Sequence, residues 1–206
     1  GYMLCDGNTD GHPLLQKVMH NPDVGKLLSA PVLVCTIDHL TPATESQRGG
    51  RQIAPMLRLM TSDLVLDEPD DFDIDDLPAL TRLVHWAGML GARVLLSSAT
   101  LPPALVQGLF AAYRNGRQHY QRNRGQRPGS DAPPAICCAW VDEFGTHQSD
   151  CAELDTFQTA HQRFVEGRVQ KLATQPARRI AKLAGLDLSG KPRDTHAQAF
   201  AAQVIK

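Results

Sequence analysis

The sequence predicts an α/β fold, in which part of a parallel sheet with flanking helices is followed by a mostly helical segment. Two observations carry this prediction. Apolar runs typical of buried parallel strands alternate with helical stretches over residues 31–115. Two of these runs, Leu64–Leu66 and Val94–Leu96, end abruptly in carboxylates and hydroxyls. Open α/β sheets place their chemistry at the carboxyl ends of such strands.

The first half of the chain supplies the strands and helices of this sheet. Residues 1–30 are predicted to be loop-rich, with a short helix over residues 14–19. Gly91 is expected to cap one helix at its C-terminus, and Pro102 to begin another. The predicted elements are a strand over residues 31–36, a helix over 52–61, a strand over 63–66, a helix over 77–90, a strand over 93–97 and a helix over 102–113.

The second half has a different composition. Residues 114–134 contain many arginines together with glycine and proline, which predicts an exposed basic connector. The arginines are Arg114, Arg117, Arg122, Arg124 and Arg127. Beyond the connector we expect a short strand over 135–141, helices over 156–173 and 177–183, and a helical end over 197–204.

Composition limits the classes of function. The 206 residues allow one domain, or one domain and part of another. A net charge of −1 excludes a global basic field for nucleic acid, although a local groove is still possible. Five scattered cysteines without a signal peptide favour a reducing cytoplasm, and no apolar run is long enough to indicate a membrane partner. Because the chain starts at Gly1 and ends in a helical stretch, we expect it to be a piece of a longer protein.

The strand ends point to nucleotide hydrolysis. An enzyme that hydrolyses a nucleoside triphosphate needs a carboxylate to hold Mg²⁺ and a second group to act on the attacking water. Asp67 is the expected metal ligand, Glu68 the group that acts on the water, and Asp70 lies one step further. Ser98 and Thr100 follow the next strand along the chain, and a crossover of this kind brings them to the same edge of the sheet.

The later acids of this run favour a structural interpretation, in which a solvated loop caps the next helix. These acids are Asp71, Asp73, Asp75 and Asp76. Their alternation also resembles a calcium loop. That interpretation is rejected, because Asp76 stands where a calcium loop needs glycine and Arg82 where it needs a bidentate glutamate.

Two further sites are less convincing. The run Gly185–Lys191 matches most of a phosphate-binding loop, but Pro192 replaces its hydroxyl and a helical stretch precedes it, so we interpret the match as chance. A zinc site of His147, Cys151 and His161 beside Cys137–Cys138 is possible. Because the paired cysteines lack the usual gap between zinc ligands, buried thiols are the favoured interpretation.

Three segments resemble superfamily 2 helicases. Asp67–Asp70 looks like their motif II, Ser98–Thr100 like motif III and Cys35–Leu40 like motif Ib. The resemblance is closer to the CRISPR-associated helicase–nuclease of type I-F systems and extends over essentially the whole chain. The segments that carry it are Leu64–Asp73, Ser97–Pro103 and Ala135–Trp140.

The resemblance implies roles for single residues. Asp67 would be a ligand of Mg²⁺–ATP and Glu68 the hydrolytic acid or base, so that both would bind the cofactor. Asp70 takes the place of a histidine that is common in related helicases. Ser98 and Thr100 would couple hydrolysis to strand movement, and Thr36 would touch the DNA backbone. The implied cofactors are ATP and Mg²⁺.

The resemblance also implies a domain plan and partners. Residues 1–115 would be part of the first RecA-like helicase domain without its phosphate loop, 116–134 the basic connector, and 135–206 the start of a region that leads to a second RecA-like domain. The implied partners are single-stranded DNA and an RNA-guided CRISPR surveillance complex.

Two functions therefore stay open. The first is a part of an ATP-dependent DNA helicase–nuclease that unwinds and degrades foreign DNA in CRISPR interference. We expect such a part to be inactive on its own, since it lacks the phosphate loop, the nuclease motif and the second RecA-like domain. The second is a catalytically inert module, derived from a RecA-like domain, that binds nucleic acid or protein.

Overall fold

The computed structural model describes four stretches of the chain, residues 22–45, 50–123, 135–176 and 195–204. The chain divides into two units, residues 1–165 and 166–206. The second unit contains the end of one long helix, α6 (Leu154–Ala173), and the helix α7 (His196–Val204). In these four stretches, no helix is both long and apolar enough to cross a membrane.

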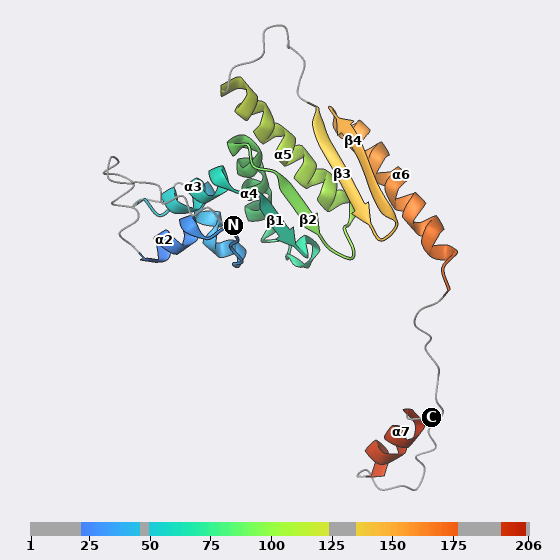
Figure 1. The fold of residues 1–206 in the computed structure, drawn as a ribbon. Helices are drawn as coiled ribbons and strands as arrows, with labels where there is room; N and C mark the ends of the chain where they lie inside the picture. Colours follow the sequence, from blue (N-terminus) through green and yellow to red (C-terminus); the bar gives the residue numbers. More distant parts are fainter. Residues whose placement is uncertain (1–21, 46–49, 124–134, 177–194, 205–206) are drawn as a thin grey trace, which may run out of the picture. The chain divides into compact units, whose positions relative to one another are not determined.

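A two-stranded parallel sheet lies at the centre of the first unit (Figure 1). Its strands are β1 (Leu64–Asp67) and β2 (Val94–Ser97), and the register pairs Leu64 with Val94 and Asp67 with Ser97. The helix α4 (Leu77–Leu90) connects them, so both strands end at the same edge, the lower edge of the view in Figure 1. The predicted α/β fold with a parallel sheet and flanking helices is confirmed.

The connecting helix α4 has the bounds that the sequence predicts. Its apolar residues recur at helical spacing and form a face that the core buries almost completely. Gly91 ends the helix in a left-handed conformation, with φ of 91°, and donates its N–H to the Gly88 carbonyl at 3.2 Å. The buried residues of α4 are Leu80, Leu83, Val84, Ala87 and Gly88.

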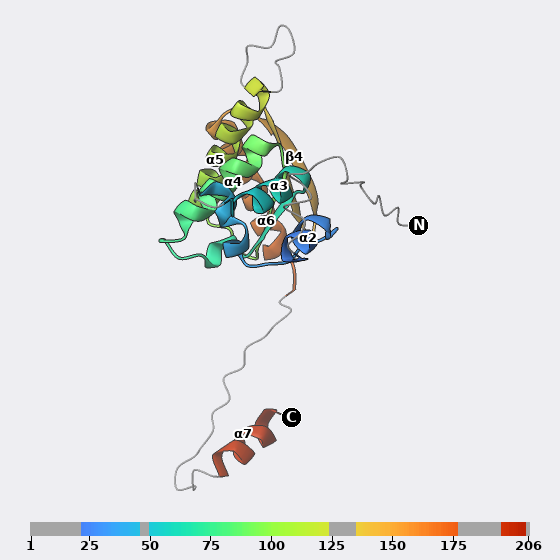
Figure 2. The same ribbon diagram turned by 90° about the vertical axis from the view of Figure 1, so that its left-hand side faces the viewer.

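The helix α5 (Pro103–Asn123) is longer than predicted. The sequence predicts that this helix ends near residue 113 and that the basic connector begins at 114, but residues 114–123 are helical. The reason is tertiary packing, because this part of α5 runs along α4. Figure 2 shows α4 and α5 together on one side of the unit. Residues 124–134, the rest of the predicted connector, lie outside the described residues.

Two glycines allow α4 and α5 to approach closely. A Cβ atom on Gly116 would lie 2.1 Å from the backbone oxygen of His85, and one on Gly88 would lie 2.5 Å from the backbone oxygen of Tyr113. Real side chains do not tolerate such distances, so each position needs glycine. The Tyr113 hydroxyl then donates to the Ala92 carbonyl at 3.0 Å, which ties α5 to the start of β2.

An antiparallel hairpin follows, where the sequence predicts one strand and a mostly helical segment. Its strands are β3 (Ile136–Asp142) and β4 (Gly145–Cys151). The turn is closed by Asp142, whose Oδ1 accepts hydrogen bonds from the N–H groups of Phe144 and Gly145 at 2.8 and 3.0 Å. The prediction of β3 is correct within one residue at each end, and β4 was missed.

The hairpin packs with α5 and α6 in a second apolar cluster. Phe110 of α5 stacks on Phe157 of α6, with ring centroids 4.2 Å apart. Trp140 of β3 donates its indole N–H to Nδ1 of His161 at 3.1 Å, and both side chains are buried. The cluster consists of Val106, Phe110, Trp140, Cys151, Phe157 and Ala160.

The N-terminal part of the first unit contains short elements and, among its described residues, no strand. These elements are α2 (Pro22–Ser29), the 3₁₀ helices η1 (Ile37–His39) and η2 (Thr41–Thr44), and α3 (Ile53–Thr61). The predicted strand over residues 31–36 is wrong: Val32 and Val34 are 78% and 92% exposed. A strand needs a hydrogen-bonding neighbour, and within the described residues the sheet of β1 contains only β2.

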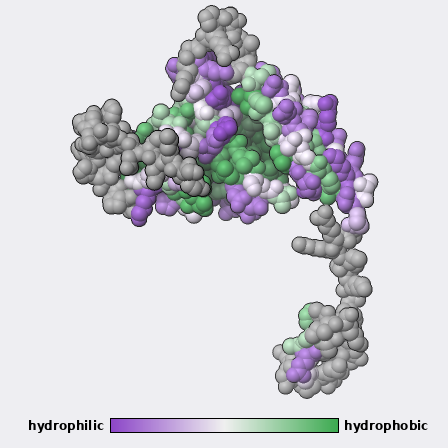
Figure 3. Space-filling model, in the orientation of Figure 1, coloured by the Kyte–Doolittle hydropathy of each residue, from purple (hydrophilic) through white to green (hydrophobic). Residues whose placement is uncertain are grey.

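The face of the sheet opposite α4 is open. Val65 and Leu95 are neighbours in the register and are 58% and 57% exposed. Figure 3 shows apolar surface gathered in the middle of this view, where Figure 1 draws the strands. Helices therefore cover one face of β1 and β2 in the described part of the chain, whereas parallel sheets are usually covered on both.

Four predictions concern other parts of the chain. The helix predicted over residues 197–204 is confirmed as α7. The helices predicted over 14–19 and 177–183 lie outside the described residues. The run at residues 185–192, which matches most of a phosphate-binding loop, also lies outside them.

The close contact between α4 and α5 can be tested by adding single methyl groups. Gly116→Ala is expected to lower the free energy of unfolding by about 1–3 kcal/mol, because backbone atoms of α4 must move. Gly108→Ala on the same helix is the matched control. Its Cβ would meet nothing within 4 Å, so it should add up to about 1 kcal/mol of helix stability. Urea unfolding measures the free energy of unfolding of both variants. Equal changes in the two would contradict the close packing of α5 on α4.

The Trp140–His161 pair predicts a pH dependence. Burial lowers the pKa of His161, so the folded state favours the neutral imidazole, whose Nδ1 can accept the bond from Trp140. The bond from Trp140 to the neutral imidazole should stabilise the fold fully above about pH 6.5, the pKa of His161 in the unfolded chain. This stabilisation should be lost as the pH falls below that value. Urea unfolding between pH 7 and 5 should therefore show a steeper loss of stability for the unchanged chain than for His161→Phe. Parallel profiles would refute this.

Candidate functional site at the ends of β1 and β2

The polar side chains predicted to meet do so at the carboxyl edge of the parallel sheet. The ladder continues one step past the strands, since the Glu68 N–H donates to the Ser97 carbonyl at 2.7 Å. This bond fixes the start of the acidic loop beside the loop that follows β2. The acidic loop itself begins with a short 3₁₀ turn, η3 (Pro69–Asp71).

Glu68 has an unusual backbone conformation. Its φ of 47° and ψ of 54° lie in the left-handed region, and among the described residues no other non-glycine residue has a positive φ. This conformation costs roughly 1–2 kcal/mol for a residue with a side chain. It is held by the bond to Ser97, by the buried ring of Pro69 and by the Asp71 N–H, which donates to the Glu68 carbonyl at 3.0 Å. Strained residues of this kind gather at functional sites.

Two hydroxyls from the β2 side bind two carboxylates from the β1 side. The Ser98 hydroxyl donates to Oε2 of Glu68 at 2.7 Å, and the Thr100 hydroxyl donates to Oδ2 of Asp70 at 2.7 Å. The Thr100 N–H donates in turn to the Ser98 hydroxyl oxygen at 3.1 Å. The structure thus brings together four of the residues predicted for the site.

The hydroxyls also influence the pKa of Asp70. Hydrogen bonding to the Ser98 hydroxyl, and then to the Thr100 hydroxyl, lowers the pKa of Asp70 below its ordinary value. Asp70 is therefore held as a carboxylate. Its Oδ1 is buried and receives no hydrogen bond from the residues that the structure describes.

Asp67 ends β1 with an exposed side chain. An exposed carboxylate next to a second one suits Mg²⁺, which keeps several water ligands and takes one or two carboxylates from the protein. Among the described residues, no group of three or more histidines, cysteines or acids is arranged to hold a metal ion. Asp67 and Glu68 thus fit a magnesium–nucleotide site whose remaining ligands are water and phosphate, not an all-protein metal cage.

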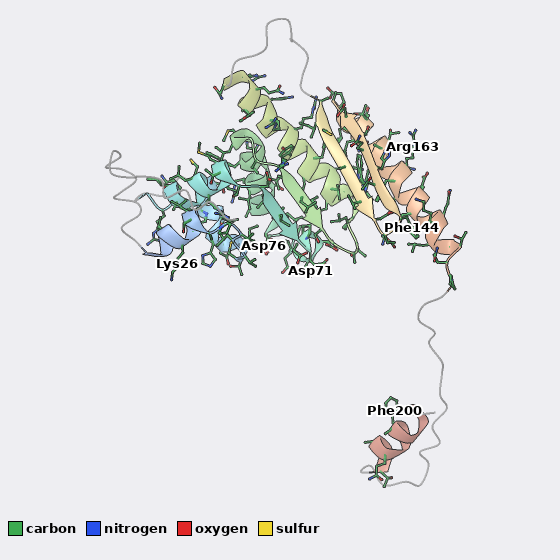
Figure 4. The ribbon with its side chains drawn as sticks, in the orientation of Figure 1. Lys26, Asp71, Asp76, Phe144, Arg163 and Phe200 are labelled. Carbon is green, nitrogen blue, oxygen red and sulfur yellow. The ribbon has the colours of Figure 1, made fainter. Side chains whose placement is uncertain are left out.

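The remaining acids form an exposed loop. Asp71, Asp73, Asp75 and Asp76 are all exposed, and Figure 4 shows Asp71 and Asp76 at the lower side of the view, near the end of β1. Asp76 occupies the position before α4, but its side chain makes no capping hydrogen bond. The loop is exposed to solvent as predicted, but no side-chain hydrogen bond from Asp76 supports the predicted capping of α4.

Among the described residues, no hydrogen bond joins Thr36 to the four interacting residues. Its side chain is exposed, and it precedes η1 without making a side-chain capping bond. Its carbonyl accepts a hydrogen bond from the His39 N–H at 3.2 Å. An exposed hydroxyl of this kind is available to a ligand.

Two of the cysteines considered for zinc, Cys138 and Cys151, belong to or pack against the second apolar cluster. Cys151 is fully buried, Cys138 is half-buried and Cys137 is exposed, so the prediction of buried thiols is right for Cys151, half right for Cys138 and wrong for Cys137. Burial raises the pKa of Cys138 to about 12, and the neighbouring Cys151 thiol contributes to this rise. A thiol with such a pKa stays protonated and is a poor metal ligand.

The arginines of the predicted connector are partly engaged. Arg114 forms an ion pair with Glu153, 2.5 Å from Nη2 to Oε1, and its side chain is only 20% exposed. The guanidinium of Arg117 lies over the ring of Tyr120, 4.5 Å from its centroid. Arg122 is exposed in the last turn of α5. Arg124 and Arg127 lie outside the described residues.

The left-handed backbone at Glu68 is not among the features that the sequence predicts. The one available signal was Pro69, because a residue before proline is disfavoured in the right-handed helical region. The ion pair between Asp63 and Arg93, 2.6 Å from Oδ2 to Nη2, precedes both strands and is also not predicted from the sequence. Hydrogen bonding from Arg93 lowers the pKa of Asp63, but the pair is exposed and lies at the opposite end of the strands from the acidic loop.

Comparisons with known proteins identify relatives of this chain. No protein-family model matches the sequence. A CRISPR-associated nuclease/helicase Cas3 of subtype I-F/YPEST from Pseudomonas aeruginosa is 56% identical over 198 residues, which are 96% of this chain and 18% of the relative. A protein of the same description from Pectobacterium atrosepticum is 54% identical over 171 residues, 83% of this chain and 15% of the relative. The chain therefore spans less than a fifth of the length of these curated relatives.

The strain at Glu68 can be measured with two substitutions. Glu68→Ala and Glu68→Gly both remove the bond to Ser98, but only alanine keeps the unfavourable left-handed backbone. We expect Glu68→Gly to be the more stable of the two in urea unfolding, by up to about 1 kcal/mol, since relief of strain exceeds the entropy that glycine adds to the unfolded chain. A Gly variant that is less stable than the Ala variant would show that Glu68 is not strained.

Proposed function

Because this chain belongs, over the residues matched, to the CRISPR-associated nuclease/helicases of subtype I-F/YPEST, we propose that it supplies the acidic half of an ATP-hydrolysis site in such an enzyme. The observation that carries the proposal is the pair of hydrogen bonds that join Glu68 to Ser98 and Asp70 to Thr100. They place two acids and two hydroxyls from neighbouring strands at one edge of a parallel sheet, where such sheets bind ligands.

In this proposal the two exposed acids, Asp67 and Glu68, have different chemical roles. Asp67 holds Mg²⁺–ATP through its carboxylate, and the metal, when bound, neutralises charge on the phosphoryl group that is transferred. Glu68 orients the attacking water and takes its proton while the bond to the leaving ADP breaks. The fixed backbone of Glu68 keeps its carboxylate at the edge of the sheet for this step.

The hydroxyl-bound acids and the DNA contact complete the proposed roles. Asp70, Ser98 and Thr100 couple hydrolysis to movement of the DNA, because their hydrogen bonds connect the acidic loop to the loop after β2. Thr36 contacts the backbone of single-stranded DNA through its exposed hydroxyl. An RNA-guided surveillance complex brings the whole enzyme to foreign DNA, which the enzyme unwinds and degrades.

The 206 residues alone are proposed to be inactive. Phosphoryl transfer needs a cradle for the phosphates and positive charge on the transferred group, usually a lysine in a glycine-rich loop and an arginine from a second domain. The sequence contains no complete phosphate-binding loop, because Pro192 interrupts the run at Gly185–Lys191. In the proposed domain plan, residues 1–115 belong to a first RecA-like domain and 135–206 lead to a second.

The alternative function, an inert module that binds nucleic acid or protein, has less support from the geometry. It depends on the arginines of the predicted connector, and two of these are already used inside the fold, Arg114 by Glu153 and Arg117 by Tyr120. An inert module also gives no reason to keep a strained, exposed glutamate at the end of a strand.

The proposal predicts the effect of Glu68→Gln in the full-length nuclease/helicase that carries this segment. ATP turnover should fall by about 10²–10⁴-fold, the usual contribution of a group that moves a proton, while ATP binding stays close to normal. Steady-state ATPase assays and equilibrium nucleotide binding measure the two effects.

The matched control is Asp71→Asn, the same change of an acid to its amide in the same exposed loop. It should leave turnover near the normal rate. Unchanged turnover in Glu68→Gln would contradict the proposed function and favour the inert module.

A further inference from the structure

Arg58 is a buried cation on the inner face of α3. It is only 9% exposed, and its Nη1 donates to the Ala30 carbonyl oxygen at 2.5 Å, across 28 positions of sequence. In the described part of the chain, no carboxylate forms an ion pair with it. A buried cation is unfavourable unless its surroundings compensate the charge, so its place in the fold needs a physical reason. The other buried residues of α3 are Ala54, Pro55 and Leu59.

The bond from Arg58 closes the C-terminal end of α2. Ala30 directly follows Ser29, the last residue of this helix, and its N–H still donates to the Lys26 carbonyl at 3.1 Å. Carbonyl groups at the end of a helix lack partners within the helix and carry partial negative charge, which favours a cation beside them. Arg58 therefore fixes the point at which the chain leaves α2.

Residues 31–36 continue from α2 as an irregular segment that ends at Thr36. Among the described residues, the N–H and C=O groups of residues 31–35 form no hydrogen bond with other backbone groups. Beyond Thr36 the chain is anchored again, because Ile37 and Leu40 pack against the main apolar core of the unit. The segment that carries Thr36 is thus held at its two ends.

The helix α3 supports both ends of this segment. Arg58 holds the start, and Leu59, the next residue of the helix, belongs to the apolar core that anchors the end. Near that end, partial burial raises the pKa of the Cys35 thiol and the positive charge of Arg58 opposes this rise, so the guanidinium also acts on the residue before Thr36. Only residues 62–63 separate α3 from β1, so α3 sets the segment relative to the strand that ends in the acidic site.

We propose that Arg58 is a positioning residue for DNA binding, which holds the end of α2 and thereby keeps the exposed Thr36 hydroxyl in place for a phosphate of single-stranded DNA. This inference rests on the proposed function and adds a residue that does not itself touch DNA. Because Arg58 is buried, it acts by restraining residues 31–36 before DNA arrives. A segment that is already ordered loses less conformational entropy when it binds, which strengthens binding.

The proposal predicts weaker DNA binding by Arg58→Met in the full-length nuclease/helicase that carries this segment. Methionine keeps a long apolar side chain but cannot donate to the Ala30 carbonyl. The dissociation constant for a labelled single-stranded oligonucleotide should rise by roughly tenfold, the effect of one lost hydrogen bond to a charged group. Arg58→Lys keeps a charge and a donor and should bind within about twofold of normal. Fluorescence anisotropy measures both.

Two measurements show how Arg58 acts. Its loss should leave the salt dependence of binding unchanged, whereas loss of a phosphate contact lowers the slope of log K against log salt by about 0.7 for single strands. The double variant Arg58→Met with Thr36→Ala should bind no more weakly than the weaker of the two single variants, because Arg58 acts through Thr36. Arg82→Met, which changes an exposed arginine of α4, is the matched control and should bind DNA normally.

The outcomes separate this inference from the proposed function. Normal DNA affinity in Arg58→Met, a reduced salt slope, or effects that add fully in the double variant would each overturn the positioning role. Circular dichroism checks the fold, and Arg58→Gln replaces Arg58→Met in the same measurements if the methionine variant does not fold. Normal DNA affinity in Thr36→Ala would instead overturn the proposed DNA contact, and normal turnover in Glu68→Gln the proposed hydrolysis.

Discussion

The parallel register between β1 and β2 is the constraint on which the rest of the structure depends. The paired residues of the strands, the ion pair that precedes them and the hydroxyl bonds that follow them all join residues thirty positions apart. A slip by one residue would turn the buried leucines of β1 outward and separate each acid from its hydroxyl. The pairs are Asp63–Arg93, Leu64–Val94, Val65–Leu95, Leu66–Leu96, Asp67–Ser97, Glu68–Ser98 and Asp70–Thr100.

The register is in turn held by the way the crossover helix packs. The helix α4 buries an apolar face against the sheet. It ends at Gly91, where the chain turns back sharply and enters β2 at a fixed point. Gly88 and Gly116 let α5 lie directly on α4, and Tyr113 bonds the carbonyl of Ala92 just before β2. The chemistry at one end of the sheet thus depends on close helix packing on one of its faces.

The sequence predicts the parts of the fold that follow from local pattern. Apolar runs that end in acids or hydroxyls predicted β1, β2 and the meeting of Glu68 with Ser98, because parallel strands share an edge. β4 was missed because its residues, Gly145–Cys151, are mostly polar and lack the apolar alternation of a strand. The length of α5 was underestimated because its last turns are kept by contacts with α4. The segment 31–36 has the composition of a strand, but no pairing partner for it is among the described elements.

The arrangement of protons in the site is a harder problem than the arrangement of residues. Pattern predicts that two acids and two hydroxyls meet, since spacing and strand order decide that. It does not predict which acceptor receives the Ser98 proton, because a serine hydroxyl has one proton and can rotate about its C–O bond. In the structure the Ser98 hydroxyl lies 2.7 Å from Oε2 of Glu68 and 3.2 Å from the Thr100 carbonyl oxygen, and Oδ1 of Asp70 has no donor among the described residues. The left-handed backbone and the hydrogen bond to Ser98 both belong to Glu68, at the sharp turn from β1 into the acidic loop, and spacing and strand order predict neither of them.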